Sequence, residues 1–131
     1  MSTSYELKFF TDVIDWIDGL RGTDRESYHS VIAALEHLRD VGPGLRRPTV
    51  GAVEGSQYRN MRELRPRSGS RMSIRILFAF DPRSRAVFLI AGNKAASSKW
   101  DRWYPAAIKE ADERYAAWLE QIELETKEGK R

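Results

Sequence analysis

The feature that most constrains the fold is a pair of adjacent strand patterns in the second half of the chain. In residues 72–80 large apolar residues alternate with others, so one face of the strand is apolar and Arg75 lies on the opposite face. Residues 86–91 are continuously apolar, which is typical of a central strand covered on both faces. Because residues 81–84 have turn composition, we predict an antiparallel hairpin at the centre of a sheet.

The N-terminal part of the chain predicts a strand followed by a helical hairpin. Residues 5–9 alternate apolar and charged side chains, as a half-buried strand does, and a short amphipathic helix follows. We expect Gly19 and Gly22 to end this helix. The second helix should be capped by Thr23 or Asp24, carry one apolar face, and stop at residues 42–44, which read Gly-Pro-Gly.

The remaining segments complete an α+β domain. We expect an irregular loop over residues 45–58, a strand over residues 60–65, and a C-terminal helix capped by Ser97 or Ser98. Pro105 falls early enough to separate the first turn from the rest of that helix. The predicted fold is a small twisted, mainly antiparallel sheet with an N-terminal helical hairpin and a C-terminal helix. It forms one domain over residues 1–131, with a frayed tail over residues 126–131.

Composition excludes several classes of protein. The 131 residues are 41% hydrophobic and 11% aromatic, which is enough for a packed core and argues against wholesale disorder. No apolar run approaches the roughly 20 residues that span a bilayer, and no secretory signal pattern is visible at the N-terminus. With no cysteine there is no disulfide scaffold, thiol nucleophile or cysteine zinc site. We therefore expect a cytoplasmic protein without a membrane partner.

Positive charge is concentrated in one stretch of the chain. The net charge is +3, but residues 46–75 alone hold eight arginines and two glutamates, a local charge of +6. Arginine binds phosphate in two-point geometry and stacks on bases, so the stretch favours a phosphate-rich partner, although a solvated basic face is also consistent with it.

Several familiar catalytic or binding motifs are absent from the sequence. There is no glycine-rich phosphate loop, and His29 and His37 lie away from the apolar face of the second predicted helix, which argues against a catalytic triad or a histidine metal site. Asp12, Asp15 and Asp18 recur every three residues, and a solvated face explains them better than metal binding. We expect no metal and no small-molecule cofactor.

Basic residues around two neighbouring strands form the best candidate site. Glu63 and Arg65 share one side of the strand over residues 60–65, Arg75 lies on the non-apolar face of the next strand, and Lys94 follows the apolar strand. If these strands pair, the cations line one concave face. Each could instead be the partner in an ordinary salt bridge or a loop residue without a functional role. The accompanying basic or aromatic candidates for binding are Arg62, Arg67, Arg71, Lys99 and Trp100.

The order and content of these segments resemble the RelE/ParE toxin superfamily. Residues 60–65, 72–78 and 88–94 read NMRELR, MSIRILF and FLIAGNK, and together they look closest to the HigB branch, also called the phage-derived Gp49-like group. The resemblance covers nearly the whole chain. It implies a RelE-like fold and a toxin of a type II toxin–antitoxin pair that cuts messenger RNA, usually on the ribosome. It also implies a helix-turn-helix antitoxin as partner.

The resemblance also assigns roles to individual residues. Arg65 matches the arginine of the family's Glu-Leu-Arg strand, Arg75 matches an arginine often placed at the scissile phosphate, and Lys94 matches the first basic position after the apolar strand. The chain departs from the family pattern at Ser73 and Phe78, where tyrosines are common. It also lacks the histidine that some relatives use, so the resemblance does not assign the general acid or base.

The chemistry can be argued from the residues. RNA supplies its own nucleophile, the 2′-hydroxyl, so alignment and cations on the developing phosphorane charge supply most of the acceleration. Glu63 is the only carboxylate in the cluster that could act as the base, and Lys94 or Lys99 could act as the acid. Trp100 or Tyr104 could stack on a base, although the position of Tyr104 on the apolar helix stripe is more typical of a core residue.

Two other functions remain open from the sequence. A ParE-like protein with the same fold would poison DNA gyrase and leave RNA intact. A basic module could also bind RNA or the ribosome without any catalysis.

Overall fold

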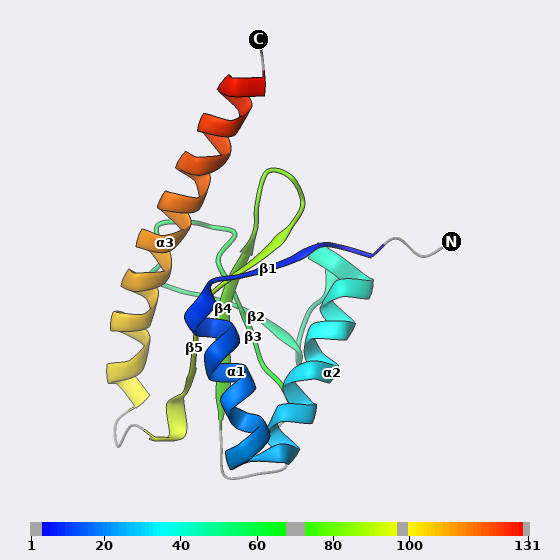
Figure 1. The fold of residues 1–131 in the computed structure, drawn as a ribbon. Coiled ribbons are helices and arrows are strands. Elements are labelled where there is room, and N and C mark those ends of the chain that lie inside the picture. Colours follow the sequence, from blue (N-terminus) through cyan, green and yellow to red (C-terminus); the bar gives the residue numbers. More distant parts are fainter. Residues whose placement is uncertain (1–3, 68–72, 97–99, 130–131) are drawn as a thin grey trace.

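The computed structural model describes residues 4–67, 73–96 and 100–129. Five strands form one mixed sheet in the order β1-β5-β4-β3-β2, with helices on both sides (Figure 1). The helices are α1 (Thr11–Thr23), α2 (Arg25–Val41) and α3 (Trp100–Gly129). This arrangement confirms the predicted α+β fold with an N-terminal helical hairpin and a C-terminal helix. In the described ranges no helix is both long enough and apolar enough to cross a membrane.

The helical hairpin is fixed by a cap between its two helices. The Asp24 carboxylate accepts a hydrogen bond from the Ser27 backbone N–H at 3.1 Å, as an N-cap residue does, and this confirms one of the two predicted caps. The prediction that Gly19 and Gly22 end the first helix is wrong, because α1 continues to Thr23. Each glycine costs about 1 kcal/mol relative to alanine, and the apolar face that α1 buries offsets this cost.

The strands β4 (Ile74–Phe80) and β5 (Ala86–Asn93) form the predicted antiparallel hairpin at the centre of the sheet. On one side of this pair, β3 (Arg62–Leu64) runs antiparallel to β4. On the other side, β1 (Leu7–Phe9) runs parallel to β5, which gives the sheet its single parallel pair in the described part of the chain.

The edge strand β2 (Val50–Ala52) lies in a segment that the sequence predicted to be an irregular loop. It pairs with β3 through Val50 opposite Leu64 and Gly51 opposite Glu63. Three residues with one glycine carry no recognisable alternation, so pairing with β3 rather than local preference forms this strand.

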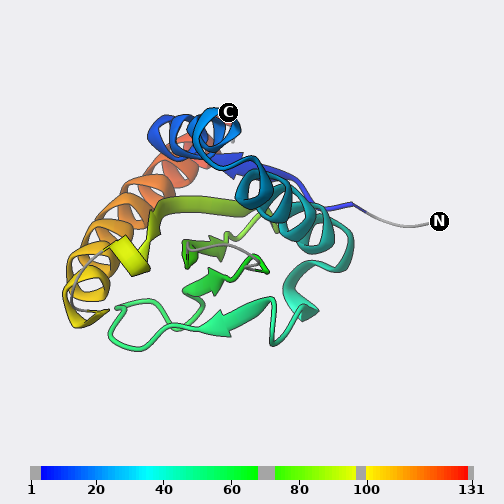
Figure 2. The same cartoon turned by 90° about the horizontal axis from the view of Figure 1, so that it is seen from below.

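The sheet separates two apolar cores. Alternate residues of β4 and β5, such as Phe78 and Phe88, pack against α1 and α2, while Leu77 and Leu89 pack against α3 on the other face. Viewed from below, α2 and α3 lie on opposite sides of the sheet (Figure 2). Both faces of β5 are therefore covered, as its continuous apolar sequence predicted.

The C-terminal helix is longer and more continuous than expected. Pro105 lies inside α3 rather than separating its first turn, because it removes only one intrahelical hydrogen bond near the helix start. The helix extends to Gly129, beyond the point at which the tail was expected to fray. Its predicted caps, Ser97 and Ser98, lie outside the described residues.

Candidate functional site

A buried carboxylate lies at the centre of the candidate site. Glu63 is a β3 residue opposite Leu77, so its side chain lies on the α3 face of the sheet, where it is only 3% exposed. Its Oε1 accepts a hydrogen bond from Arg65 Nε at 2.7 Å and one from the Tyr104 hydroxyl at 3.3 Å. The Nε of Arg75 lies 3.6 Å from the same oxygen. We call these four residues and Lys94 the Glu63 cluster.

Arg75 enters the cluster with one donor unsatisfied. It lies on β4 opposite Gly92, and its Nη1 donates a hydrogen bond to the Ile74 carbonyl at 2.8 Å. Its Nε is buried and has no hydrogen-bond partner in the described part of the chain. The nearby Glu63 carboxylate, 3.6 Å from this nitrogen, provides its electrostatic compensation as an ion pair.

Lys94 begins the short 3₁₀ turn that follows β5 and is only 6% exposed. Its Nζ lies 5.6 Å from the centre of the Tyr104 ring, within the range of a cation–π interaction. Burial lowers the pKa of the Lys94 ammonium, Arg75 lowers it further, and Glu63 acts in the opposite direction. The fold therefore makes Lys94 a more acidic ammonium than an exposed lysine.

Tyr104 is the member of the cluster that sequence reasoning assigned mainly to the core. It lies near the start of α3, half-buried, with its hydroxyl on Glu63. Burial raises the pKa of the Tyr104 hydroxyl, and the negative charge of Glu63 raises it further, so the phenol remains protonated and donates. The helix stripe gave no signal for this role, because only the packing of α3 on the sheet aims the hydroxyl at Glu63.

Two glycines create the room that the cluster occupies. A Cβ at Gly51 would lie 2.8 Å from the Arg65 guanidinium carbon, so only a glycine at this position of β2 lets Arg65 lie across the strand. A Cβ at Gly92 would lie 2.5 Å from Nε1 of Trp103, whose indole covers the β5 backbone beside Arg75. The start of α3 thus packs directly against the strand that carries the site.

Not all of the predicted binding residues join this cluster. Arg62 pairs with Ala52 and donates hydrogen bonds to the Arg59 and Met61 carbonyls, away from Glu63. Arg67 is exposed and lines a separate hollow against α2. Arg71 and Lys99 lie outside the described residues, and for Trp100 the structure gives the backbone at the start of α3 only.

The helix residues that sequence analysis set aside are placed elsewhere. His29 and His37 are exposed, as predicted. Asp12 binds Arg114 of α3, with Oδ2 at 2.6 Å from Nη2, and Asp18 lies 3.4 Å from Arg21. Within the described ranges no group of three or more histidine, aspartate or glutamate side chains is arranged to hold a metal ion.

The charge of the Glu63 cluster favours an anion as its ligand. Three cationic side chains converge on one carboxylate, so the site carries a formal charge of +2 when all are ionised. Guanidinium groups offer paired donors to phosphate, and the partly dry surroundings strengthen that attraction. The arginines are partly neutralised by Glu63, which orients them and leaves positive charge in excess.

The fold and the cluster together define a small α+β protein with a cationic site at one end of its sheet. A family model described as Phage derived protein Gp49-like matches residues 18–116, and the chain belongs to this family. The match confirms the resemblance to the HigB branch of the RelE/ParE superfamily.

Two proteins of Mycobacterium tuberculosis are close relatives. The candidate toxin named HigB2 is 51% identical over 108 residues, which cover 82% of this chain and 51% of the relative. The candidate toxin named HigB3 is 47% identical over 96 residues, which cover 73% of this chain and 80% of the relative. The match to this chain thus spans about half the length of HigB2 and most of HigB3.

Proposed function

We propose that the protein is the toxin of a type II toxin–antitoxin system and that it cleaves messenger RNA in the cytoplasm. The names of its relatives support the toxin assignment. The observation that carries the nuclease assignment is the grouping of Arg65, Arg75 and Lys94 around one buried carboxylate, with cationic charge in excess. A phosphate group is an anion that such a set of cations can bind.

The reaction that suits these groups is attack by the 2′-hydroxyl of the RNA on its own phosphate. The 2′-oxygen forms a bond to phosphorus, the bond from phosphorus to the 5′-oxygen breaks, and the products are a 2′,3′-cyclic phosphate and a 5′-hydroxyl. Arg65 and Arg75 would stabilise the charge on the phosphorane. Because they are always ionised, they are poor proton donors, so proton transfer is left to other members of the cluster.

We assign proton transfer to Lys94 and Tyr104. Because the pKa of Lys94 is lowered and that of Tyr104 is raised, the Lys94 ammonium is a better candidate than the Tyr104 hydroxyl to protonate the leaving 5′-oxygen. Glu63 is buried, and its Oε1 already accepts hydrogen bonds from Arg65 and Tyr104, which favours an orienting role over direct contact with RNA. A proton leaving the 2′-hydroxyl for Glu63 would pass through the Tyr104 hydroxyl.

The decisive experiment is cleavage of a defined messenger RNA by the purified protein. It should be run with and without translating ribosomes, and with EDTA, because the proposed reaction needs no metal ion. We expect 5′-hydroxyl ends, and no cleavage where a 2′-deoxynucleotide replaces the nucleotide at the cut. Arg75→Gln should lower the rate by about 10²–10³, the usual effect of removing one such donor.

Arg39→Gln provides the matched control, because Arg39 is an exposed α2 residue whose side chain is 46% accessible. It should cleave like the parent. The deoxynucleotide substrate tests the mechanism on the unaltered protein, so it does not depend on how well Arg75→Gln folds. A folded Arg75→Gln variant with parental activity would contradict the assignment of the site.

The same preparation separates the two other functions. Inhibition of gyrase supercoiling without RNA cleavage would favour a ParE-like poison. RNA binding without cleavage under any of these conditions would favour a non-catalytic module. We further propose a small helix-turn-helix antitoxin as the cognate partner, and co-expression with the protein encoded beside this gene should relieve growth arrest.

A further inference from the structure

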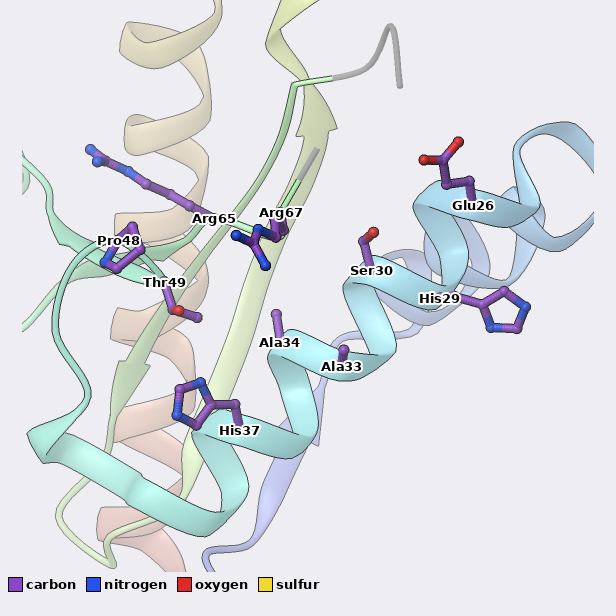
Figure 3. Close-up of a pocket in the computed structure, with 10 residues that line it drawn as sticks. All are labelled: Glu26, His29, Ser30, Ala33, Ala34, His37, Pro48, Thr49, Arg65 and Arg67. Atoms are coloured by element: carbon purple, nitrogen blue, oxygen red, sulfur yellow. The ribbon is translucent and has the colours of Figure 1, made fainter. Parts of the chain in front are cut away.

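Two hollows lie beside the edge strand β2. The larger, of about 790 Å³, separates α2 from the residues at the start of β2 and the end of β3 (Figure 3). The smaller, of about 490 Å³, lies along β2 itself and the segment that precedes it. Both are open at the surface.

Arginines dominate the charge of both hollows. Arg65 and Arg67 line the larger, and Arg46, Arg47 and Arg62 line the smaller. Against these five cations, the residues that line the two hollows include one carboxylate, Glu26. A surface of this charge is complementary to a chain of phosphates.

Arg65 is shared by the Glu63 cluster on the α3 face and by the lining of the larger hollow on the α2 side. This residue donates to Glu63 and also contributes to the lining of the hollow. In Figure 3 the Arg65 side chain points away from α2, while Arg67 lies in the space that faces Thr49 and α2. A chain that left the cluster past Arg65 and turned around the β2 edge would then face Arg67.

The walls of the hollows leave space for a nucleotide. Ala33 and Ala34 present the α2 side of the larger hollow, and Gly51 and Ala52 form the β2 side of the smaller. Because these side chains are small, the surface between the longer arginine side chains is recessed. The floor can thus accept a ribose and base while the guanidinium groups reach phosphates.

We propose that the RNA strand continues from the Glu63 cluster past Arg65 and along the β2 edge, where Arg46 and Arg47 bind its phosphates together with Arg67. This inference rests on the proposed RNA cleavage and adds the path of the substrate beyond the cut. Charged residues beside an edge strand, such as Arg46 and Arg47 before β2, can also prevent its pairing with other sheets, so the experiment must distinguish binding from protection of the edge.

The test uses the variant Arg46→Gln/Arg47→Gln and an RNA made uncleavable by a 2′-deoxynucleotide at the cut. We expect a decamer to bind the variant about tenfold more weakly at low salt, with the slope of log K against log salt reduced by about 1.4 for two lost phosphate contacts on a single strand. The difference should shrink for a trinucleotide, which has too few phosphates to occupy the cluster and Arg46 and Arg47 together.

The control variant Arg21→Gln/Arg39→Gln removes the same charge from the helical hairpin, where both side chains are exposed. It should leave decamer affinity and salt slope unchanged. Equal losses in the two double variants, or none in either, would overturn the proposed path. So would a loss of antitoxin binding with RNA binding intact, which would assign the edge to a protein partner. If the parent protein neither binds nor cleaves RNA, the proposed function itself fails.

Discussion

At Lys94 the proposed requirement of activity and the requirement of folding stability conflict. Burial and Arg75 lower its pKa from the ordinary value of 10.5, so the folded protein holds this proton less tightly than the unfolded chain does. Between the lowered pKa and 10.5 the unfolded chain binds more protons, and in this window the contribution of Lys94 to stability rises with pH. At pH values below this window, burial of the protonated Lys94 side chain lowers the free energy of unfolding.

Replacing Lys94 by methionine should therefore affect activity and stability in opposite ways. If the proposed function holds, we expect Lys94→Met to lose about 10²–10⁴ in cleavage rate, because it removes the proposed proton donor. At pH 7 its melting temperature should equal or exceed that of the parent, and this advantage should shrink as the pH rises toward 10.5. Thermal melts across this pH range measure the effect, with the exposed Lys109→Met as control. A variant that melts well below the parent at pH 7 would refute this account.

At the scale of elements, the contact between β5 and α3 sets the position of Tyr104. Trp103 lies over Gly92, and the next residue, Tyr104, reaches Glu63. The two aromatic rings also contact each other edge to face, with centroids 5.0 Å apart. Any displacement of Trp103 should therefore move Tyr104 away from the cluster.

Gly92→Ala tests the packing of Trp103 on β5 on which this arrangement depends. The new Cβ would lie 2.5 Å from the Trp103 indole nitrogen, so the indole must shift, at a cost of about 1–3 kcal/mol in the free energy of unfolding. The matched control is Gly19→Ala on α1, where a Cβ meets nothing within 4 Å and should stabilise the helix by about 0.5–1 kcal/mol. Urea unfolding measures both. Equal stability of the two variants would show that α3 does not depend on Gly92.

The position of α3 explains which parts of the site could be predicted from the sequence and which could not. The convergence of Arg65, Arg75 and Lys94 follows from strand periodicity, because pairing of β3, β4 and β5 places them on one face. The burial of Glu63 and the role of Tyr104 depend on where α3 packs, and no local pattern encodes that position. The short strand β2 was not predicted either, because it forms by pairing with β3 and no local sequence pattern indicates that pairing.

At the scale of the whole molecule, one sheet serves two cores. Both β4 and β5 contribute residues to the α1–α2 core and to the α3 core, so opening either core disturbs the same strands. The Glu63 cluster lies on the α3 face, and the larger hollow lies on the α2 side. The relative position of the two cationic surfaces is thus fixed by the sheet between them.

Unfolding should accordingly be a single transition seen from both faces. Trp16 packs against the first core and Trp118 against the second, so variants in which one of these is the only one of the four tryptophans retained report each core separately by fluorescence. Both should give the same urea midpoint. Leu35→Ala in the first core and Ile108→Ala in the second should each lower the free energy of unfolding by about 2–5 kcal/mol and shift both reporters together.

The exposed residue Ile14, with a relative accessibility of 48%, supplies the control. Ile14→Ala should change stability by no more than about 0.5 kcal/mol, because it opens no cavity. If Leu35→Ala shifted only the Trp16 transition and left that of Trp118 unchanged, the two cores would be separate folding units. The sheet would then fail to couple the helical hairpin to the face that carries Glu63, and the two cationic surfaces would not be held in one fixed arrangement.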